Sequence, residues 1–107
     1  MIALSATVRA TEPGHALAML GRSLRRFRHL GSRDGNVLVH VANIGQVLVC
    51  ESAGRTRLDM VATNEVTAAA MVETIRGELA LATPGRSFER SFSLEWSRPS
   101  VIPPALR

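Results

Sequence analysis

The fold is decided by residues 36–62, NVLVHVANIGQVLVCESAGRTRLDMVA, where three apolar runs are separated by two turns that contain glycine. A period of two in the valine-rich runs is typical of β-strands. The first turn, Asn43 to Gly45, predicts a three-residue hairpin loop with Gly45 at positive φ. A second turn at Ala53 to Arg55 leads into the third run. The stretch therefore predicts an antiparallel meander of three strands.

The flanking sequence supplies two helices and two further strands. Residues 2–9 alternate as a half-buried strand, and Pro13 then opens a helix with one apolar stripe that ends at Gly31. Asn64 is positioned to cap a second helix, and residues 91–97, SFSLEWS, predict the last strand. We expect an α+β two-layer sandwich in the order β-α-β-β-β-α-β, with a five-stranded, mainly antiparallel sheet and both helices on one face. Residues 1–97 form the single domain, and 98–107 are an extended or frayed proline-rich tail.

Composition limits the class of protein. A chain of 107 residues is one domain of ordinary size. The lone Cys50 excludes an internal disulfide and a multi-cysteine zinc site, and no apolar run is long enough to cross a membrane, so we expect a cytoplasmic protein. The formal net charge is +4, and every basic residue is arginine. Such a charge permits an anionic partner without requiring one.

The two turns also predict which residues share a face of the sheet. Three-residue loops set His40 opposite Leu48 and Cys50 opposite Leu58, with Glu51 opposite Arg57 at the rim beside Asp59. One face then collects Leu38, His40, Leu48, Cys50, Leu58 and Met60, and the other collects Val37, Val39, Val41, Val47, Val49 and Val61.

We assign the leucine and methionine face to the helices, because longer side chains fill the gap between layers. The valine face then points outward as an unusually large apolar patch. We therefore expect a homo-oligomer that buries this face. The alternative is that the tail, with Val101, Ile102 and Leu106, folds back over the patch, and a one-residue slip in a loop would exchange the two faces.

Cys50 and His40 are the candidate pair for thiol chemistry. The expected register sets them on one face, diagonal across the hairpin, as a nucleophile and its base would require. An inert, buried cysteine is the favoured interpretation. His15, His29 and His40 share no metal-ligand spacing, so we expect no metal and no cofactor. The sequence contains no catalytic motif, and it therefore favours a protein that is not an enzyme.

The densest positive charge lies on the first expected helix, at Arg22, Arg25, Arg26 and Arg28, with Arg33 in the loop behind it. Guanidinium groups bind phosphate and carboxylate bidentately, so this face is a candidate anion site. A solvated helix face is the favoured reading. We do not expect nucleic-acid binding, because the chain has no tyrosine and few other aromatic residues for stacking on bases.

The order of elements resembles an uncharacterised bacterial family, domain of unknown function 2218. The resemblance rests on Ala6, Val8, Thr11 and Pro13 near the start, Ala62 at the step from strand to helix, and a closing Leu94, Glu95 and Trp96. It implies a stand-alone domain with an accessory role in iron acquisition, next to siderophore-interacting flavoproteins. Typical family members carry a histidine in each helix. This chain has Ser23 and Glu78 at about those positions, so the resemblance does not imply a metal site here.

The leading functional hypothesis is a non-catalytic, oligomeric binding or accessory module, with a possible link to iron and siderophore handling. A small enzyme or ligand-processing domain that uses Cys50 and His40 is the first alternative. Anion or nucleic-acid binding by the Arg22 to Arg28 helix face is the second.

Overall fold

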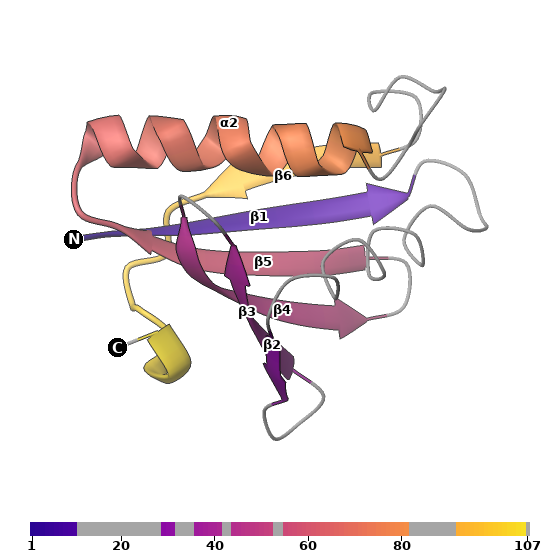
Figure 1. Ribbon diagram of the computed structural model, residues 1–107, viewed down its shortest axis with the longest axis horizontal. Helices are drawn as coiled ribbons and strands as arrows, with labels where there is room; N and C mark the ends of the chain where they lie inside the picture. Colours follow the sequence, from indigo (N-terminus) through magenta and orange to yellow (C-terminus); the bar gives the residue numbers. More distant parts are fainter. Residues whose placement is uncertain (11–28, 32–35, 42–43, 53–54, 82–91, 107) are drawn as a thin grey trace.

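The computed structural model describes residues 1–10, 29–31, 36–41, 44–52, 55–81 and 92–106. These ranges contain six strands, one α-helix and one 3-10 helix (Figure 1). In chain order the elements are β1 (Ile2–Ala10), β2 (His29–Gly31), β3 (Asn36–Val41), β4 (Gly45–Ser52), β5 (Arg55–Ala62), α2 (Glu65–Leu81), β6 (Phe92–Ser97) and η2 (Pro104–Leu106). The α+β class is confirmed. The predicted order of elements is not matched, because one α-helix rather than two is present in these ranges.

The strands form one antiparallel sheet in the order β2-β3-β4-β5-β1-β6. All five expected strands are present, and β1 lies inside the sheet between β5 and β6 (Figure 1). The sixth strand, β2, is a correction, because His29–Gly31 were expected to end the first helix. They pair instead with Val37–Val39 of β3, which gives their backbone groups hydrogen-bond partners. The earlier part of that expected helix lies outside the described residues.

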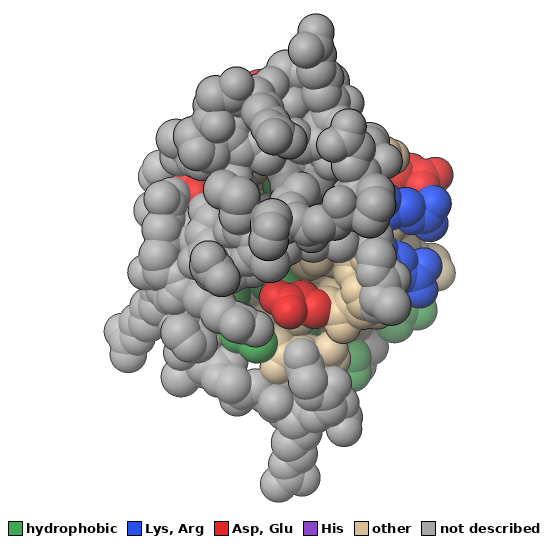
Figure 2. Space-filling view, turned by 90° about the vertical axis from the view of Figure 1, so that its right-hand side faces the viewer, with side chains coloured by type: hydrophobic (Ala, Val, Ile, Leu, Met, Phe, Trp, Pro, Cys, Tyr) green, Lys and Arg blue, Asp and Glu red, His purple; other side chains and the backbone are tan. Residues whose placement is uncertain are grey.

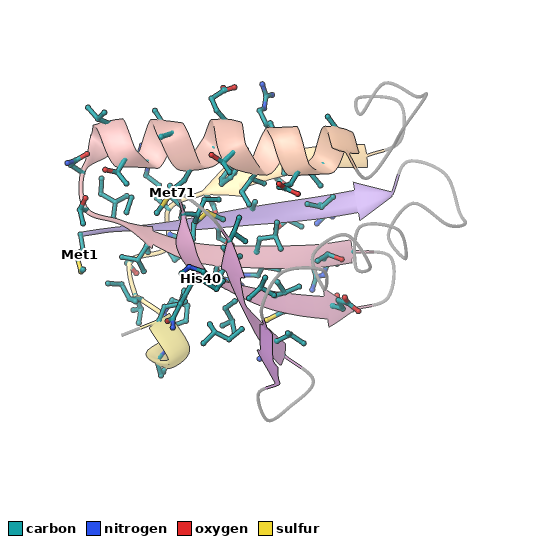
Figure 3. All side chains as sticks on the ribbon, in the orientation of Figure 1. Met1, His40 and Met71 are labelled. Atoms are coloured by element: carbon teal, nitrogen blue, oxygen red, sulfur yellow. The ribbon has the colours of Figure 1, made fainter. Side chains whose placement is uncertain are left out.

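Helix α2 begins where the sequence predicts. The side chain of Asn64 accepts a hydrogen bond from the backbone N–H of Thr67, with a distance of 2.8 Å between Oδ1 and N. This is the N-cap arrangement, which satisfies one of the free donors at a helix start. One stripe of the helix is buried against the sheet, and Met71 points from it toward the strands (Figure 3). The stripe consists of Ala68, Met71, Ile75 and Leu79.

The valine face of β3 and β4 is the core, not the outer surface, so the expected assignment of faces is wrong for these strands. Val39, Val41, Val47 and Val49 are all buried, and Val37 packs against the same cluster. They share the cluster with Leu4, Ala6 and Val8 of β1, with Leu58, Met60 and Ala62 of β5, and with the buried stripe of α2. Hence these five valines form no outward apolar patch.

The length of the second turn explains the error. Strand β4 ends at Ser52 and β5 begins at its partner Arg55, so two residues join the strands where three were expected. Because side chains alternate, this one-residue difference turns all of β5 over. Leu58 and Met60 therefore join the valines, while Val61 takes the other face.

The first hairpin also differs from the expected register, but without changing its faces. His40 lies opposite Gln46 rather than Leu48, a shift of two residues. Gly45 has a φ of 95°, as the expected left-handed turn residue should, and the N–H of Ile44 donates to the carbonyl of Val41 over 3.1 Å. A shift of two preserves the alternation, so the faces of β3 and β4 stay intact.

The tail is more ordered than its prolines suggested. Arg98 binds the carboxylate of Glu65 with both terminal nitrogens, and the Nη2 to Oε2 distance is 2.7 Å. The chain then returns to β4, against which η2 packs (Figure 1). Ile102 and Leu106 are partly buried, whereas Val101 is exposed. The expectation of an extended or frayed tail is therefore wrong for Pro104–Leu106.

Candidate functional site

The outer face of the sheet, which points away from α2, carries two arginines directly opposite each other. Arg9 of β1 pairs in register with Arg55 of β5, and both side chains are exposed. Their row continues to Ser52 on β4 and to Ser93 on β6. Side chains opposite each other in an antiparallel pair have Cβ atoms about 5 Å apart, and like charges there are destabilising. The row therefore concentrates positive charge between two serine hydroxyls.

A third arginine lies next to this pair. Arg57 follows Arg55 by two residues on β5 and so shares its face. We call Arg9, Arg55 and Arg57 the arginine patch. In the space-filling view, basic side chains lie side by side along one margin of the molecule, next to acidic ones (Figure 2).

The three arginines differ in their partners. The Nε of Arg57 lies 3.1 Å from Oδ2 of Asp59, whose side chain is almost fully buried. The Nε of Arg55 donates to the hydroxyl of Ser52 over 3.2 Å. No carboxylate among the described residues pairs with Arg9 or with Arg55. Within the described part of the chain, two of the three positive charges in the patch are thus available to bind an anion.

The ion pair of Arg57 with Asp59 was expected at the rim, but Glu51 was misplaced. Cys50, not Glu51, lies opposite Arg57, because the two-residue turn shifts the register by one. Glu51 is therefore on the other face, opposite Thr56. Asp59 lies between Leu48 and the buried Ser5 in the next row of the outer face.

Cys50 and His40 share one face, as expected, but it is the outer face rather than the expected helix-facing one, and the structure does not bring them together. His40 lies opposite Gln46, four residues before Cys50, which is roughly 13 Å along the strand. Burial raises the pKa of the Cys50 thiol, the negative charge of Asp59 raises it further, and Arg57 acts in the opposite direction. A thiol with a raised pKa and no adjacent histidine among the described side chains is a poor nucleophile at neutral pH.

Labelling of Cys50 should therefore be slow at neutral pH and should accelerate only above the usual thiol pKa. Asp59→Asn removes a charge that raises the pKa of the thiol, so it should move the rate profile to lower pH. The measurement is the initial rate of reaction with a disulfide reagent as a function of pH. Glu73→Gln, which removes an exposed carboxylate on α2, should leave the profile unchanged. Fast labelling of the parent protein below the usual thiol pKa would contradict this expectation.

The other expected sites have different outcomes. Val39, Val41, Val47 and Val49, which were candidates for an oligomer interface, are core residues, and Val61 is partly buried on the outer face. The Arg22, Arg25, Arg26 and Arg28 helix face and Arg33 lie outside the described residues. Among the residues that are described, no group of three His, Cys, Asp or Glu side chains is placed to hold a metal ion. No helix within the described ranges is long and apolar enough to span a membrane.

Sequence inspection missed Arg9 and Arg55 as a pair. They lie far apart in the chain and meet only because β1 pairs with β5. The available signal was alternation: Arg9 falls on the polar side of the first strand, and Arg55 falls on the same side as Arg57 and Asp59. Nothing local indicated that these two polar sides would adjoin. Comparison with protein-family models, with curated proteins and with solved structures finds no match to this chain.

Proposed function

We propose that this domain is a non-catalytic binding module that holds a small phosphate- or carboxylate-bearing ligand on the arginine patch. The observation that carries the proposal is the direct cross-strand pairing of Arg9 with Arg55. Two like charges held side by side repel each other, and a bound anion removes that repulsion. Stability is thus expected to increase when the site is filled.

The chemistry of the patch suits an oxyanion. A guanidinium group offers a planar fork of N–H donors that matches phosphate and carboxylate oxygens. The hydroxyls of Ser52 and Ser93 flank the pair in the same row. The hydroxyl of Ser52 donates to the carbonyl of Arg55, and that of Ser93 offers a further donor. The sheet holds the backbones of these residues in fixed relative positions, so binding has to order only their side chains.

This function is preferred to thiol chemistry because Cys50 has a raised pKa and is separated from His40. It is consistent with the binding or accessory role expected from the sequence. A cytoplasmic location remains part of the proposal, as does a role in iron acquisition next to a siderophore-related flavoprotein. An anionic siderophore complex would belong to the proposed class of ligand.

Calorimetric titration of the full chain with pyrophosphate and with citrate tests the proposal. We expect saturable binding at low ionic strength that weakens as salt screens the charges. Arg9→Ala and Arg55→Ala should each weaken binding by about tenfold or more, because a hydrogen bond to a charged group contributes about 1.5–3 kcal/mol. The affinity of Arg9→Lys should lie between those of the parent and Arg9→Ala, because lysine keeps the charge but lacks the planar pair of N–H donors.

Arg76→Ala is the matched control, because Arg76 is exposed on α2, away from the patch. It removes the same charge and should leave affinity nearly unchanged. An equal loss of affinity in all three alanine variants would mean that binding depends only on the net charge of the protein. That result would overturn the proposal. Binding of an RNA oligomer with far higher affinity than either small anion would also overturn it, in favour of a nucleic-acid surface.

A further inference from the structure

Strand β6 ends the sheet with an edge that no described segment occupies. It pairs with β1 through six consecutive residue pairs, and the sheet order stops there (Figure 1). A terminal strand presents a row of backbone N–H and C=O groups that can hydrogen-bond to another strand. The opposite end of the sheet, β2, has only three residues and offers a much shorter edge.

The sequence of β6 contains only one of the features that usually prevent such pairing, the charge of Glu95. Natural edge strands are protected by lysine, proline, bulges or inward-pointing charge. Strand β6 reads FSLEWS, without lysine or proline, and its unbroken register with β1 contains no bulge. Its one charge, on Glu95, points to the outer face together with the exposed Ser93 and Ser97.

The other side of β6 is apolar and incompletely covered. Leu94 and Trp96 pack against the core but keep some exposure. The indole Nε1 of Trp96 is buried and has no hydrogen-bond partner. A buried, unpaired donor is costly, and such groups in a folded chain need an explanation. A strand added at this edge would cover the exposed parts of Leu94 and Trp96.

We infer that β6 is a self-association edge, where it pairs antiparallel with β6 of a second copy of the chain. A two-fold axis requires the contact to be self-complementary. When Leu94 of one copy lies opposite Leu94 of the other, Ser93 of each copy lies opposite Glu95 of the other. The apolar sides of the two β6 strands then lie on the same side of the joined sheet. The next such register sets Glu95 against Glu95, which is unfavourable. The Leu94-centred register is therefore the one that the sequence of β6 favours.

Charge complementarity supports the same register. Arg9 lies opposite Ser93 within one copy, so Glu95 of the second copy falls one strand further along the same row. Two interstrand spacings, about 10 Å, separate the backbones that carry these opposite charges. The joined sheet has twelve strands, with both α2 helices on the same side. This interface is distinct from the valine face, and it shares Ser93 with the row that holds Arg9 and Arg55.

Sedimentation velocity of the full chain over a dilution series tests the inference. The parent protein should dissociate from dimer to monomer on dilution, and the emission of Trp96, the only tryptophan, should shift over the same range. Ser93→Glu sets like charges opposite each other twice across the axis and should shift the transition to at least tenfold higher concentration. Adding Glu95→Arg to Ser93→Glu should restore the dimer, because the pairs become attractive.

Ser100→Glu, which adds the same charge to the exposed tail, should leave the transition unchanged. Ser93 is exposed, so its variant should keep the circular dichroism spectrum of the parent, and its thermal midpoint should match that of the parent at concentrations where both are monomeric. A chain that is monomeric at every concentration would overturn the inference. So would a dimer that Ser93→Glu does not weaken, because its interface would then lie elsewhere.

Discussion

Leu58→Ala is expected to lower the free energy of unfolding by about 3 kcal/mol, since removing a buried leucine side chain leaves a cavity that the core only partly fills. Leu58 is 1% exposed and lies among the buried residues of β1, β4 and β5. Equilibrium unfolding in urea, followed by circular dichroism, measures the change. The slope of the transition should stay the same, because the folded and unfolded states expose similar areas in both proteins.

Leu38→Ala is the informative comparison. The register expected from the sequence sets Leu38 and Leu58 on the same helix-facing side, which would make the two losses similar. In the structure Leu38 lies on the outer face and is only partly buried. Leu38→Ala should therefore lower the free energy of unfolding by less than half as much as Leu58→Ala. Equal losses would show that the face assignment derived from the two-residue turn is wrong.

Ile75→Ala should produce the second large loss, about 2–4 kcal/mol, because Ile75 is buried at the centre of the stripe that holds α2 on the sheet. Alanine favours helix slightly more than isoleucine, so propensity offsets only a small part of the loss. Thermal and urea unfolding of the purified variant measure it.

Val66→Ala on the same helix serves as its control. Val66 is 81% exposed, so its replacement should change the free energy of unfolding by no more than about 0.5 kcal/mol. A comparable loss at both positions would mean that α2 is not anchored through the stripe that includes Ile75.

Local patterns in the sequence predicted local structure well. Alternation located β1, β3, β4, β5 and β6, and the cap at Asn64 and the positive φ at Gly45 were both confirmed. These features depend on residues close together in the chain, where side-chain period and turn chemistry act directly. The alternation that located β1 also corresponds to its packing, because Leu4, Ala6 and Val8 lie in the core cluster.

Predicting which face of the sheet packs against the helix requires information that the local sequence pattern does not contain. Both sides of β4 are apolar over Val47, Leu48 and Val49, so hydrophobicity does not indicate which side is buried. The choice then rests on the register with β5, which one residue in the turn decides. The arginine patch was missed for a related reason: it requires the long-range pairing of β1 with β5, which no short motif specifies.

The central position of β1 has a consequence for the order in which the molecule assembles. Strands β3, β4 and β5 are joined by short turns and can pair as soon as they are made, because closing a short loop costs little entropy. Strand β1 has to wait for β5, and then for β6 near the other end of the chain, before both of its edges are paired. Such non-local pairing slows folding, so insertion of the first strand is expected to limit the rate. Until then, β1 is synthesised but unpaired, and it is the strand that most needs protection from other chains.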